Sequence, residues 1–309
     1  DGVPQDLPAP TESLAELIAK SVATYGTNVA LEFFGAETTY AELGAQIDRA
    51  AQGLLDLGVQ AGDPVAIVLP NCPQHIAAFY AVLRIGAIVV EHNPLYTPRE
   101  LRHQFEDHGA KVVIAWNKVV ETIQGFAADL QVNAIISIDV TEAMPPVTRA
   151  MLRLPIAKAK AAREALTTSV SGTIPWRTLL KSAPIAASVP VPSVADVALI
   201  QYTSGTTGHP KGATLTHANL VINAEQARSW VPAVPRGTSV VYAVLPMFHA
   251  YGLTLCLTFA MSMGARLVLF PRFDPDLVLK VIKKRPATFL PAVPPIYERL
   301  TAAAAEQGV

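Results

Sequence analysis

The sequence predicts an α/β fold in which mostly parallel sheets are flanked by helices. Short runs rich in Val, Ile and Leu alternate with helical patterns along most of the chain. Several of these runs are continuously apolar, as expected for strands covered on both faces. The composition agrees, because 51% hydrophobic and 16% charged residues are typical of a globular chain. At 309 residues the chain is long enough for one large core or two smaller ones.

Each predicted element follows from its residue pattern. Apolar runs with strong β propensity predict strands at 65–69, 87–91, 111–116, 134–139, 197–202, 239–245, 265–270 and 288–290. Apolar residues at helical spacing predict helices at 40–57, 74–85, 98–108, 217–229, 253–263 and 275–284. A further helix is expected close to the last residues, LTAAAAEQGV.

Two segments interrupt this alternation and suggest the domain organisation. Residues 141–183 form a basic insertion rich in proline and alanine, and 183–195 read as an extended linker because prolines and small residues cannot sustain a helix. We therefore expect one α/β subdomain over 1–190 and a second over 191–309. The chain begins without Met, and neither end has the character of a natural terminus.

Charge, cysteine content and hydropathy exclude several classes of protein. A net charge of −1 gives no general attraction for nucleic acid. Cys72 and Cys256 form no metal-binding or disulfide pattern and are expected to be inert core thiols in a reducing cytoplasm. The first ten residues do not resemble a signal peptide, and the most apolar window, 253–263, is too short and interrupted to span a bilayer.

The chemistry is expected in the connection between the strand at 197–202 and the helix that begins at His217. This connection, 203–216, lies within the sequence YTSGTTGHPKGATLTH. Glycines allow backbone N–H groups to approach an anion closely, and hydroxyls can donate to phosphate oxygens or bind a metal. Charge-assisted hydrogen bonds contribute roughly 1.5–3 kcal/mol each, so a few could hold a triphosphate. The residues that supply these groups are Thr203, Ser204, Gly205, Thr206, Thr207, Gly208, Lys211 and Gly212.

Other interpretations of this loop fit less well. A P-loop needs Gly-Lys followed by Ser or Thr, whereas the order here is Lys211-Gly212-Ala213. No G-x-G-x-x-G dinucleotide fingerprint is present. A flexible surface loop is the remaining alternative, but the density of hydroxyls beside a lysine and after a strand favours phosphate binding.

The segment YTSGTTGHPKG resembles the signature of the adenylate-forming (AMP-binding) superfamily, which includes acyl-CoA synthetases, aryl-CoA ligases, luciferases and peptide-synthetase adenylation domains. Four further segments are similar to that family: TTYAEL at 38–43, the strand–helix–strand stretch at 65–96, VVYAVLPMFHAYGL at 240–253 and PAVPPIYERL at 291–300. The resemblance is to the N-terminal part of a long-chain fatty acid–CoA ligase. It implies the N-terminal portion of the acetyl-CoA synthetase-like fold, layered αβαβα, with the C-terminal domain absent.

The resemblance also implies roles for individual residues. The loop residues Ser204, Gly205, Thr206, Thr207, Gly208 and Lys211 would contact the ATP phosphates, and Thr203 would bind Mg²⁺. Catalytic roles would fall to Lys211 and His249. A lone His beside an apolar strand is more often a core residue, but relatives place an aromatic residue or His here beside the acyl carboxylate. Tyr251 and Gly252 would then line the acyl tunnel.

The implied reaction is ATP-dependent activation of a carboxylic acid, expected to be a medium- or long-chain fatty acid, to acyl-AMP, followed by transfer to coenzyme A. Both first reactants are anionic, so charge neutralisation and positioning would supply most of the catalysis. The Mg²⁺-binding Glu, ribose-binding Asp, hinge and C-terminal catalytic Lys of the family are missing before Val309. We therefore expect the chain to be about the first half of such an enzyme and inactive in adenylation as it stands.

Several alternatives remain open. Within the superfamily they are an aryl-acid CoA ligase, a luciferase-like oxygenase and an acyl-AMP ligase that loads a carrier protein. From another class, the chain could be a noncatalytic nucleotide-binding or scaffold protein. The basic segment 149–164 could contact anionic lipid at the inner face of the membrane, or could be a solvated surface helix. The sequence predicts no oligomeric state.

Overall fold

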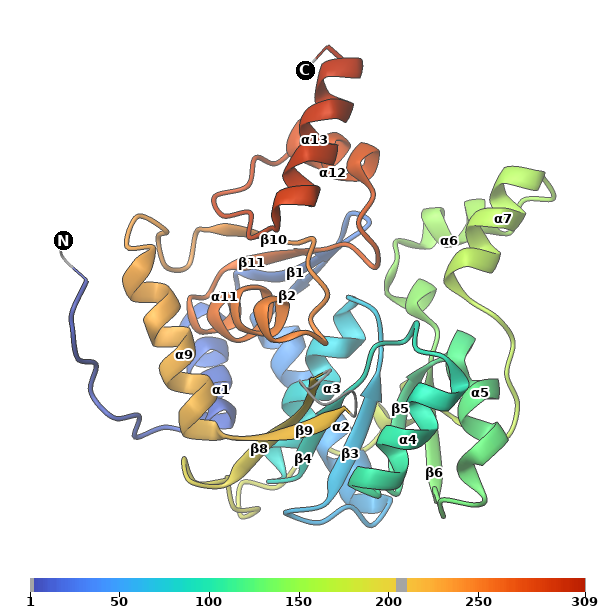
Figure 1. The fold of residues 1–309 in the computed structure, drawn as a ribbon, viewed down its shortest axis with the longest axis vertical. Coiled ribbons are helices and arrows are strands. Elements are labelled where there is room, and N and C mark those ends of the chain that lie inside the picture. The colour runs from blue at the N-terminus through green and yellow to red at the C-terminus, as the bar shows by residue number, and fades with distance from the viewer. Residues whose placement is uncertain (1–2, 204–209, 309) are drawn as a thin grey trace.

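A computed structural model describes residues 3–203 and 210–308 and shows a mixed α/β molecule (Figure 1). The strands are β1 (Val29–Phe33), β2 (Ala36–Thr39), β3 (Pro64–Val68), β4 (Ile88–Glu91), β5 (Val112–Trp116), β6 (Ala134–Ile138), β7 (Ile174–Pro175), β8 (Val197–Thr203), β9 (Lys211–Thr216), β10 (Val240–Ala243) and β11 (Arg266–Leu269). The helices are α1 (Leu14–Tyr25), α2 (Tyr40–Asp56), α3 (Pro73–Arg84), α4 (Pro98–His108), α5 (Asn117–Ala127), the 3₁₀ turn η1 (Val140–Ala143), α6 (Pro146–Leu152), α7 (Ala157–Leu166), α8 (Trp176–Leu179), α9 (His217–Trp230), α10 (Ala250–Gly252), the π-helical η2 (Leu253–Thr258), α11 (Phe259–Ser262), α12 (Pro275–Ile282) and α13 (Pro294–Glu306).

The described strands form two sheets. The larger sheet has the order β7-β6-β5-β3-β4-β8-β9, and the smaller one has the order β10-β11-β1-β2. Neighbouring strands are parallel except for two pairs, β8 with β9 and β1 with β2. Parallel pairing brings the carboxyl ends of β3, β4, β5 and β8 to one edge of the larger sheet, which is where open α/β sheets bind ligands.

Helices and sheets alternate in five layers. Helices α1, α2 and α3 lie between the sheets, with α3 in contact with both β3 and β1. The outer face of the larger sheet is covered by α4 and α5, and that of the smaller sheet by α12 and α13. The predicted αβαβα layering of largely parallel sheets is confirmed.

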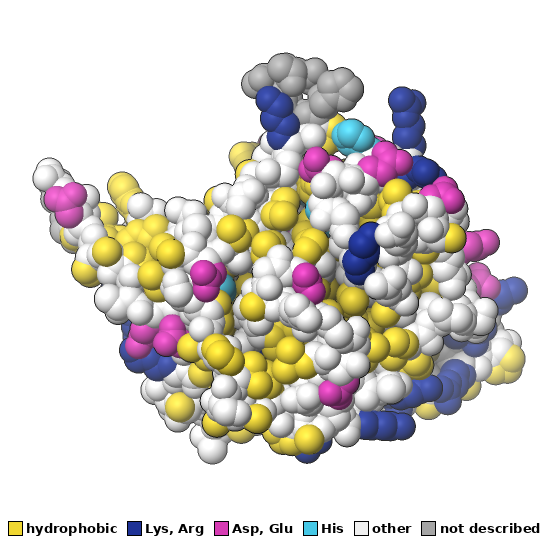
Figure 2. Space-filling view, turned by 90° about the horizontal axis from the view of Figure 1, so that it is seen from below, with side chains coloured by type: hydrophobic (Ala, Val, Ile, Leu, Met, Phe, Trp, Pro, Cys, Tyr) yellow, Lys and Arg dark blue, Asp and Glu magenta, His cyan; other side chains and the backbone are white. Residues whose placement is uncertain are grey.

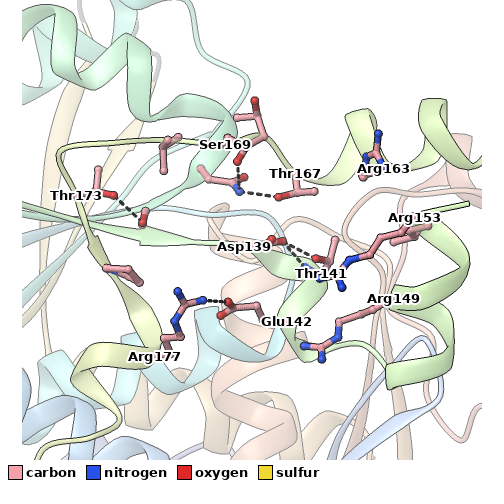
Figure 3. Close-up of a pocket in the computed structure, with 16 residues that line it drawn as sticks. Asp139, Thr141, Glu142, Arg149, Arg153, Arg163, Thr167, Ser169, Thr173 and Arg177 are labelled. Carbon is pink, nitrogen blue, oxygen red and sulfur yellow. Dashed lines mark hydrogen bonds and ion pairs between the residues drawn. The ribbon is translucent and has the colours of Figure 1, made fainter. Parts of the chain in front are cut away.

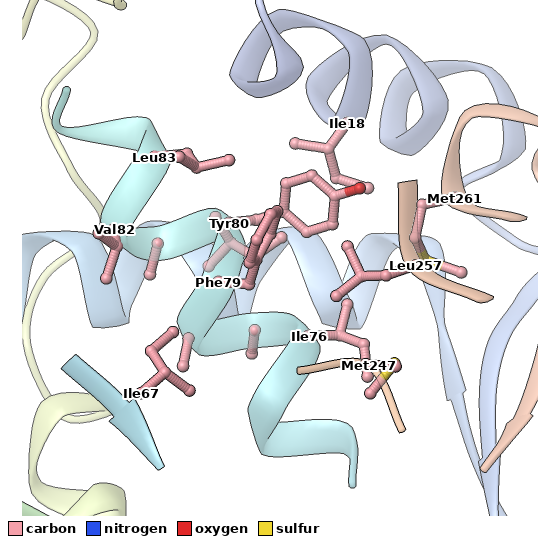
Figure 4. Packing of buried hydrophobic residues seen from close by; sticks show 14 of the residues in the cluster. Ile18, Ile67, Ile76, Phe79, Tyr80, Val82, Leu83, Met247, Leu257 and Met261 are labelled. Carbon is pink, nitrogen blue, oxygen red and sulfur yellow. The ribbon is translucent and has the colours of Figure 1, made fainter. Parts of the chain in front are cut away.

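The core between the sheets is centred on α3. This helix begins with Pro73 and is buried from Pro73 to Leu83, since its sequence is apolar on nearly all sides. Figure 4 shows Phe79 and Tyr80 packed among side chains of α1, β3, η2 and α11. The two rings meet edge-on with centroids 5.3 Å apart. Cys72 and Cys256 are both buried thiols, and burial raises the pKa of each to about 12.

Most predicted elements are confirmed, and three predictions need correction. Residues 211–216, assigned to a connecting loop, form β9. Residues 288–290, assigned to a strand, contribute only a single bridge between Phe289 and Val241. The predicted helix at 253–263 begins as the π-helical η2. Its backbone hydrogen bonds therefore join residues five apart, where those of an α-helix join residues four apart.

The division near residue 190 does not separate the sheets. β8 and β9 complete the larger sheet begun by β3–β7, and β1 pairs with β11 in the smaller one. Each sheet thus contains strands from both sides of residue 190. The subdomains 1–190 and 191–309 stay a prediction. Among the described residues, none of the helices has the length and apolar character needed to cross a membrane.

Candidate functional site

The predicted phosphate-binding loop joins two paired strands. β8 and β9 are antiparallel, and Thr203 is the cross-strand partner of Lys211. Thr203 and Lys211 are both exposed at this end of the hairpin. Ser204, Gly205, Thr206, Thr207 and Gly208, which were predicted to grip phosphate, lie outside the described residues.

Gly212 has a structural reason to follow Lys211. A Cβ at this position would lie 2.8 Å from Ile200 Cγ2 and 3.4 Å from the Tyr202 ring. Any larger residue would require the Ile200 side chain or the β9 backbone to shift. The glycine thus keeps Lys211 opposite Thr203 at the base of the loop.

β8 is also tied to α4 immediately before Thr203. The Tyr202 hydroxyl donates its proton to Asp107 Oδ2 at 2.6 Å, and the Gln104 carbonyl oxygen lies 3.2 Å from the same hydroxyl. Burial, together with the adjacent Asp107 carboxylate, raises the pKa of Tyr202 well above its ordinary value. The phenol therefore stays protonated and donating, and the strand end is held in place.

Two histidines, the buried His92 and the half-buried His108, pack beneath this strand end. His92 follows β4, stacks on Tyr202 with ring centroids 5.9 Å apart, and shares a 2.6 Å hydrogen bond with Gln104. Burial lowers the pKa of His92 to about 4. Burial and the neighbouring His92 lower the pKa of His108 to about 2. Both rings are therefore neutral at physiological pH and act here as packing groups.

Asn71 holds the second predicted part of the site, the segment 240–253, through side-chain hydrogen bonds. Its Nδ2 donates to the carbonyls of Ala243 and Leu245, at 2.9 and 2.8 Å, and its Oδ1 accepts from Met247 N at 2.9 Å. Asn71 is 4% exposed and lies just beyond the carboxyl end of β3. This side chain therefore connects the larger sheet to the segment that leads to His249.

A second bond joins this segment to the predicted phosphate loop. Gln201 Nε2, on β8 two residues before Thr203, donates to the Phe248 carbonyl at 2.9 Å. Asn71 and Gln201 were not predicted from the sequence. The signal that could have indicated them is a single amide side chain at the carboxyl end of a buried parallel strand.

The three residues predicted for the acid site differ in their surroundings. His249 is exposed, packs edge-on against Phe248 with ring centroids 4.7 Å apart, and has a pKa lowered by partial burial. Tyr251 is 48% exposed. Gly252 is buried, and a Cβ there would lie 2.0 Å from the Pro246 carbonyl oxygen, so its role in this structure is a close backbone approach.

Tyr251 borders a cavity of about 1190 Å³ between α9 and the start of η2. Its apolar lining includes Ile222, Trp230 and Leu255, and residues 3–7 line it as well. His249 and Gly252 are absent from this described lining. Of the acid-site residues predicted from the sequence, Tyr251 is thus the one that faces a large cavity.

The described residues contain no group of three or more His, Cys, Asp or Glu side chains that could hold a metal ion. Thr203, predicted to bind Mg²⁺, offers one exposed hydroxyl at the base of the loop. A single hydroxyl fits Mg²⁺ only where other oxygen ligands, such as nucleotide phosphates and water, complete its shell.

The sequence model described as "AMP-binding enzyme" matches residues 18–308. The chain belongs to the AMP-binding enzyme family. The matched range includes both strands of the β8–β9 hairpin and the segment held by Asn71.

Curated relatives of this AMP-binding chain are named as CoA ligases. The long-chain-fatty-acid–CoA ligase of Bacillus subtilis (strain 168) is 33% identical over 302 residues, covering 96% of this chain and 52% of the relative. The enzyme of the same name from Yersinia pestis is 33% identical, covering 96% and 54%. The 4-coumarate–CoA ligase 3 of Oryza sativa subsp. japonica is 31% identical, covering 85% and 42%. The chain spans about half the length of these relatives.

Solved structures share the fold. A long-chain-fatty-acid–CoA ligase from Archaeoglobus fulgidus superposes with a TM-score of 0.79 at 24% identity, covering 99% of this chain and 56% of that one. ATP-bound MatB from Rhodopseudomonas palustris gives a TM-score of 0.73 at 26% identity, covering 93% and 50%. The layered fold described above is therefore the N-terminal part of the fold of this fatty-acid–CoA ligase, and MatB shares it.

Proposed function

We propose that the β8–β9 hairpin carries the ATP phosphate-binding loop of an enzyme that converts a carboxylic acid to acyl-AMP and then to its coenzyme A thioester. The observation that carries this proposal is the pairing of Thr203 with Lys211, since it gives the loop TSGTTGHPK a fixed base. The Gln201–Phe248 hydrogen bond supports it further, because it ties the strand before the loop to the segment that precedes His249.

In this proposal Lys211 neutralises phosphate charge, and Thr203 supplies a hydroxyl to Mg²⁺ that the nucleotide also binds. The loop residues between them, Ser204–Gly208 by sequence, donate hydrogen bonds to phosphate oxygens. Bound Mg²⁺ would offset the negative charge of the triphosphate as the carboxylate approaches the α-phosphorus. By the family resemblance, His249, whose pKa is lowered by partial burial, would stand beside the acid carboxylate.

A fatty acid is the acid class that the cavity beside Tyr251 supports. A volume of about 1190 Å³ with Ile222, Trp230 and Leu255 in its lining suits a long apolar chain. The curated relatives named as long-chain-fatty-acid–CoA ligases point to the same class. An aryl acid is the second candidate, since the rice relative is named for 4-coumarate.

ATP binding tests the proposed grip. If the loop binds the phosphates of ATP and not its adenine, ATP and inorganic tripolyphosphate should bind the 309-residue chain with similar affinity. Isothermal titration calorimetry in Mg²⁺-containing buffer measures both affinities. Lys211→Ala should weaken both by about tenfold or more, because it removes a charge-assisted contact. Lys283→Ala, at an exposed lysine after α12, is the matched control. Equal affinity of the Lys211→Ala and Lys283→Ala chains would argue against the proposal.

We also propose that α6 and the residues after it contact an anionic membrane surface. Figure 1 shows α6 and α7 projecting beside the larger sheet. Met151, Leu154 and Ile156 are 59%, 48% and 55% exposed, and α6 buries none of its residues. Arg153 lies among these apolar side chains, and Arg149, Lys158 and Lys160 flank them in sequence, a combination that favours binding to anionic lipid.

Co-sedimentation with phosphatidylglycerol vesicles tests this contact. The triple variant Met151→Ser, Leu154→Ser, Ile156→Ser should bind vesicles several-fold more weakly, because apolar area is lost from the lipid-facing side. The control is Leu95→Ser, Val191→Ser, Val293→Ser, which changes three exposed apolar residues elsewhere. If both triple variants sediment with vesicles equally, the apolar residues of 151–156 do not mediate the contact.

A further inference from the structure

A second, polar cavity lies apart from the predicted ATP and acid sites. It has a volume of about 520 Å³ and is lined by residues that follow the carboxyl ends of β5 and β6 and by residues of α6, α7 and α8. Figure 3 shows Arg149 and Arg153 reaching from α6 toward Thr141 and Glu142, with Arg177 approaching Glu142 from the other side.

Side-chain hydrogen bonds hold one wall of this cavity in place. Asn117, the residue after β5, donates from Nδ2 to Thr167 Oγ1 and to the Thr168 carbonyl, both at 2.7 Å. Thr173 Oγ1 donates to Ser137 Oγ at 2.9 Å. These bonds hold the segment 167–173 against the sheet. The cavity therefore has a fixed wall opposite the arginines of α6.

The charge of the lining is positive and only partly compensated. Four arginines against two carboxylates, Asp139 and Glu142, leave a formal net charge of +2. Arg177 pairs with Glu142 at 2.6 Å, and Asp139 accepts hydrogen bonds from Thr141 N and Oγ1. The remaining arginines, which form no ion pair with any carboxylate of the described residues, are Arg149, Arg153 and Arg163.

Two buried polar atoms in the lining lack partners within the described chain. Asn117 is 4% exposed, and its Oδ1 accepts no hydrogen bond there. Arg149 Nε is likewise buried and donates none. Buried polar groups normally find a partner, so these two atoms indicate a ligand that both accepts and donates hydrogen bonds.

We propose that this cavity binds a phosphate group that carries a hydroxyl or a protonated oxygen. Its anionic oxygens would accept from Arg149 and Arg153, since arginine forks match phosphate geometry. Its proton would go to Asn117 Oδ1. The phosphate belongs either to a small soluble molecule or to a lipid headgroup, and the second source alone rests on the proposed membrane contact of α6.

Titration of the 309-residue chain with inorganic phosphate at constant ionic strength tests the cavity directly. Calorimetry or ³¹P NMR should show saturable binding. Sulfate, which has no proton to donate to Asn117 Oδ1 at neutral pH, should bind more weakly. The double variant Arg149→Gln, Arg153→Gln should lose affinity for phosphate by about tenfold or more.

The matched control is Arg99→Gln, Arg236→Gln, which removes two exposed arginines elsewhere on the molecule and should leave phosphate binding unchanged. ATP binding should survive in the Arg149→Gln, Arg153→Gln variant, whose affinity for inorganic phosphate falls. Loss of phosphate binding with ATP binding retained separates a failure of the cavity from a failure of the proposed ATP loop. Absence of saturable phosphate binding, equal binding of sulfate, or equal loss in both double variants would overturn the proposal.

Vesicles distinguish the two sources of phosphate. If the ligand is a headgroup, phosphatidylcholine vesicles containing phosphatidic acid should displace inorganic phosphate, and the Arg149→Gln, Arg153→Gln chain should bind them less. If the ligand is soluble, these vesicles should leave phosphate bound while phosphate itself still saturates the cavity. Both results support phosphate recognition by the cavity, and they differ in where the phosphate comes from.

Discussion

Gly252 illustrates how a single missing Cβ shapes the candidate acid site. Its backbone angles, φ −66° and ψ −41°, are those of an ordinary helix, so backbone freedom does not explain the glycine. The explanation is steric, because the Pro246 carbonyl oxygen occupies the space that a Cβ would need. The tunnel role that the sequence resemblance implies for Gly252 stays a prediction, and the structure adds a packing reason for the glycine.

Substitution by alanine separates the two roles. Gly252→Ala should lower the free energy of unfolding by about 2 kcal/mol, because the backbone must shift to relieve the overlap. Gly125→Ala in α5 should raise it by roughly 0.5–1 kcal/mol, since nothing lies within 4 Å of a Cβ there and alanine favours a helix. Urea denaturation of both variants measures the difference. A neutral Gly252→Ala would show that this contact is not tight.

At the scale of elements, continuity of the apolar pattern decided which strands the sequence could predict. β3 and β5 are unbroken apolar runs and β6 is interrupted only by Ser137, and each was predicted within about two residues of its ends. β9 reads KGATLT and is largely exposed at the sheet edge, so its pattern resembles a loop. Its strand structure comes from pairing with β8, which no local pattern records.

The same limit on prediction from sequence applies to the candidate site. Thr203 and Lys211 could be placed by motif, and the structure then brings them together as cross-strand partners. Asn71 and Gln201 could not, because each acts through carbonyls more than 45 residues away in the chain, such as Leu245 for Asn71 and Phe248 for Gln201. Contacts of that separation depend on the tertiary fold.

The contact between α4, β4 and β8 makes stability depend on pH. His92 and His108 have folded pKa values of about 4 and about 2, against about 6.5 in the unfolded chain. Below pH about 6.5 the unfolded chain therefore binds more protons, and the free energy of unfolding falls as the pH is lowered toward 4. Each histidine should cost at most about 2 kcal/mol at pH 5.

Urea unfolding at pH 7 and pH 5 checks this dependence. His108→Asn removes one titrating group, so its stability should fall less between the two pH values than that of the unchanged chain. Gln60→Asn changes a residue without a titrating side chain at an exposed position and should keep the original pH dependence. Protonation of His108 would not be the cause if both variants gave the same difference.

At the scale of the whole molecule, the chain presents charge unevenly. Figure 2 shows Lys and Arg side chains gathered at the lower right of that view, while Asp and Glu are scattered among apolar and uncharged residues. With a net charge of −1, the positive regions are local. Attraction of phosphate or anionic lipid is therefore expected at particular places such as α6 and its cavity.

Thr203 is the single residue predicted to bind Mg²⁺ in this chain, which spans 52% of the Bacillus subtilis ligase. We expect the chain to release no pyrophosphate from ATP and a fatty acid, because Thr203 alone is a weak Mg²⁺ site. A coupled pyrophosphate assay with the Bacillus subtilis enzyme as positive control measures this. Turnover above background would contradict the expectation.

A cut in the β8–β9 connection would leave both sheets shared between the two pieces of the chain. A break anywhere between Thr203 and Lys211 would leave one piece with β1–β8 and the other with β9–β11. Each sheet would then contain strands from both pieces, since β9 pairs with β8 and β11 pairs with β1. The two pieces should therefore stay associated without a covalent link, and a nicked chain should migrate as one particle until it is denatured.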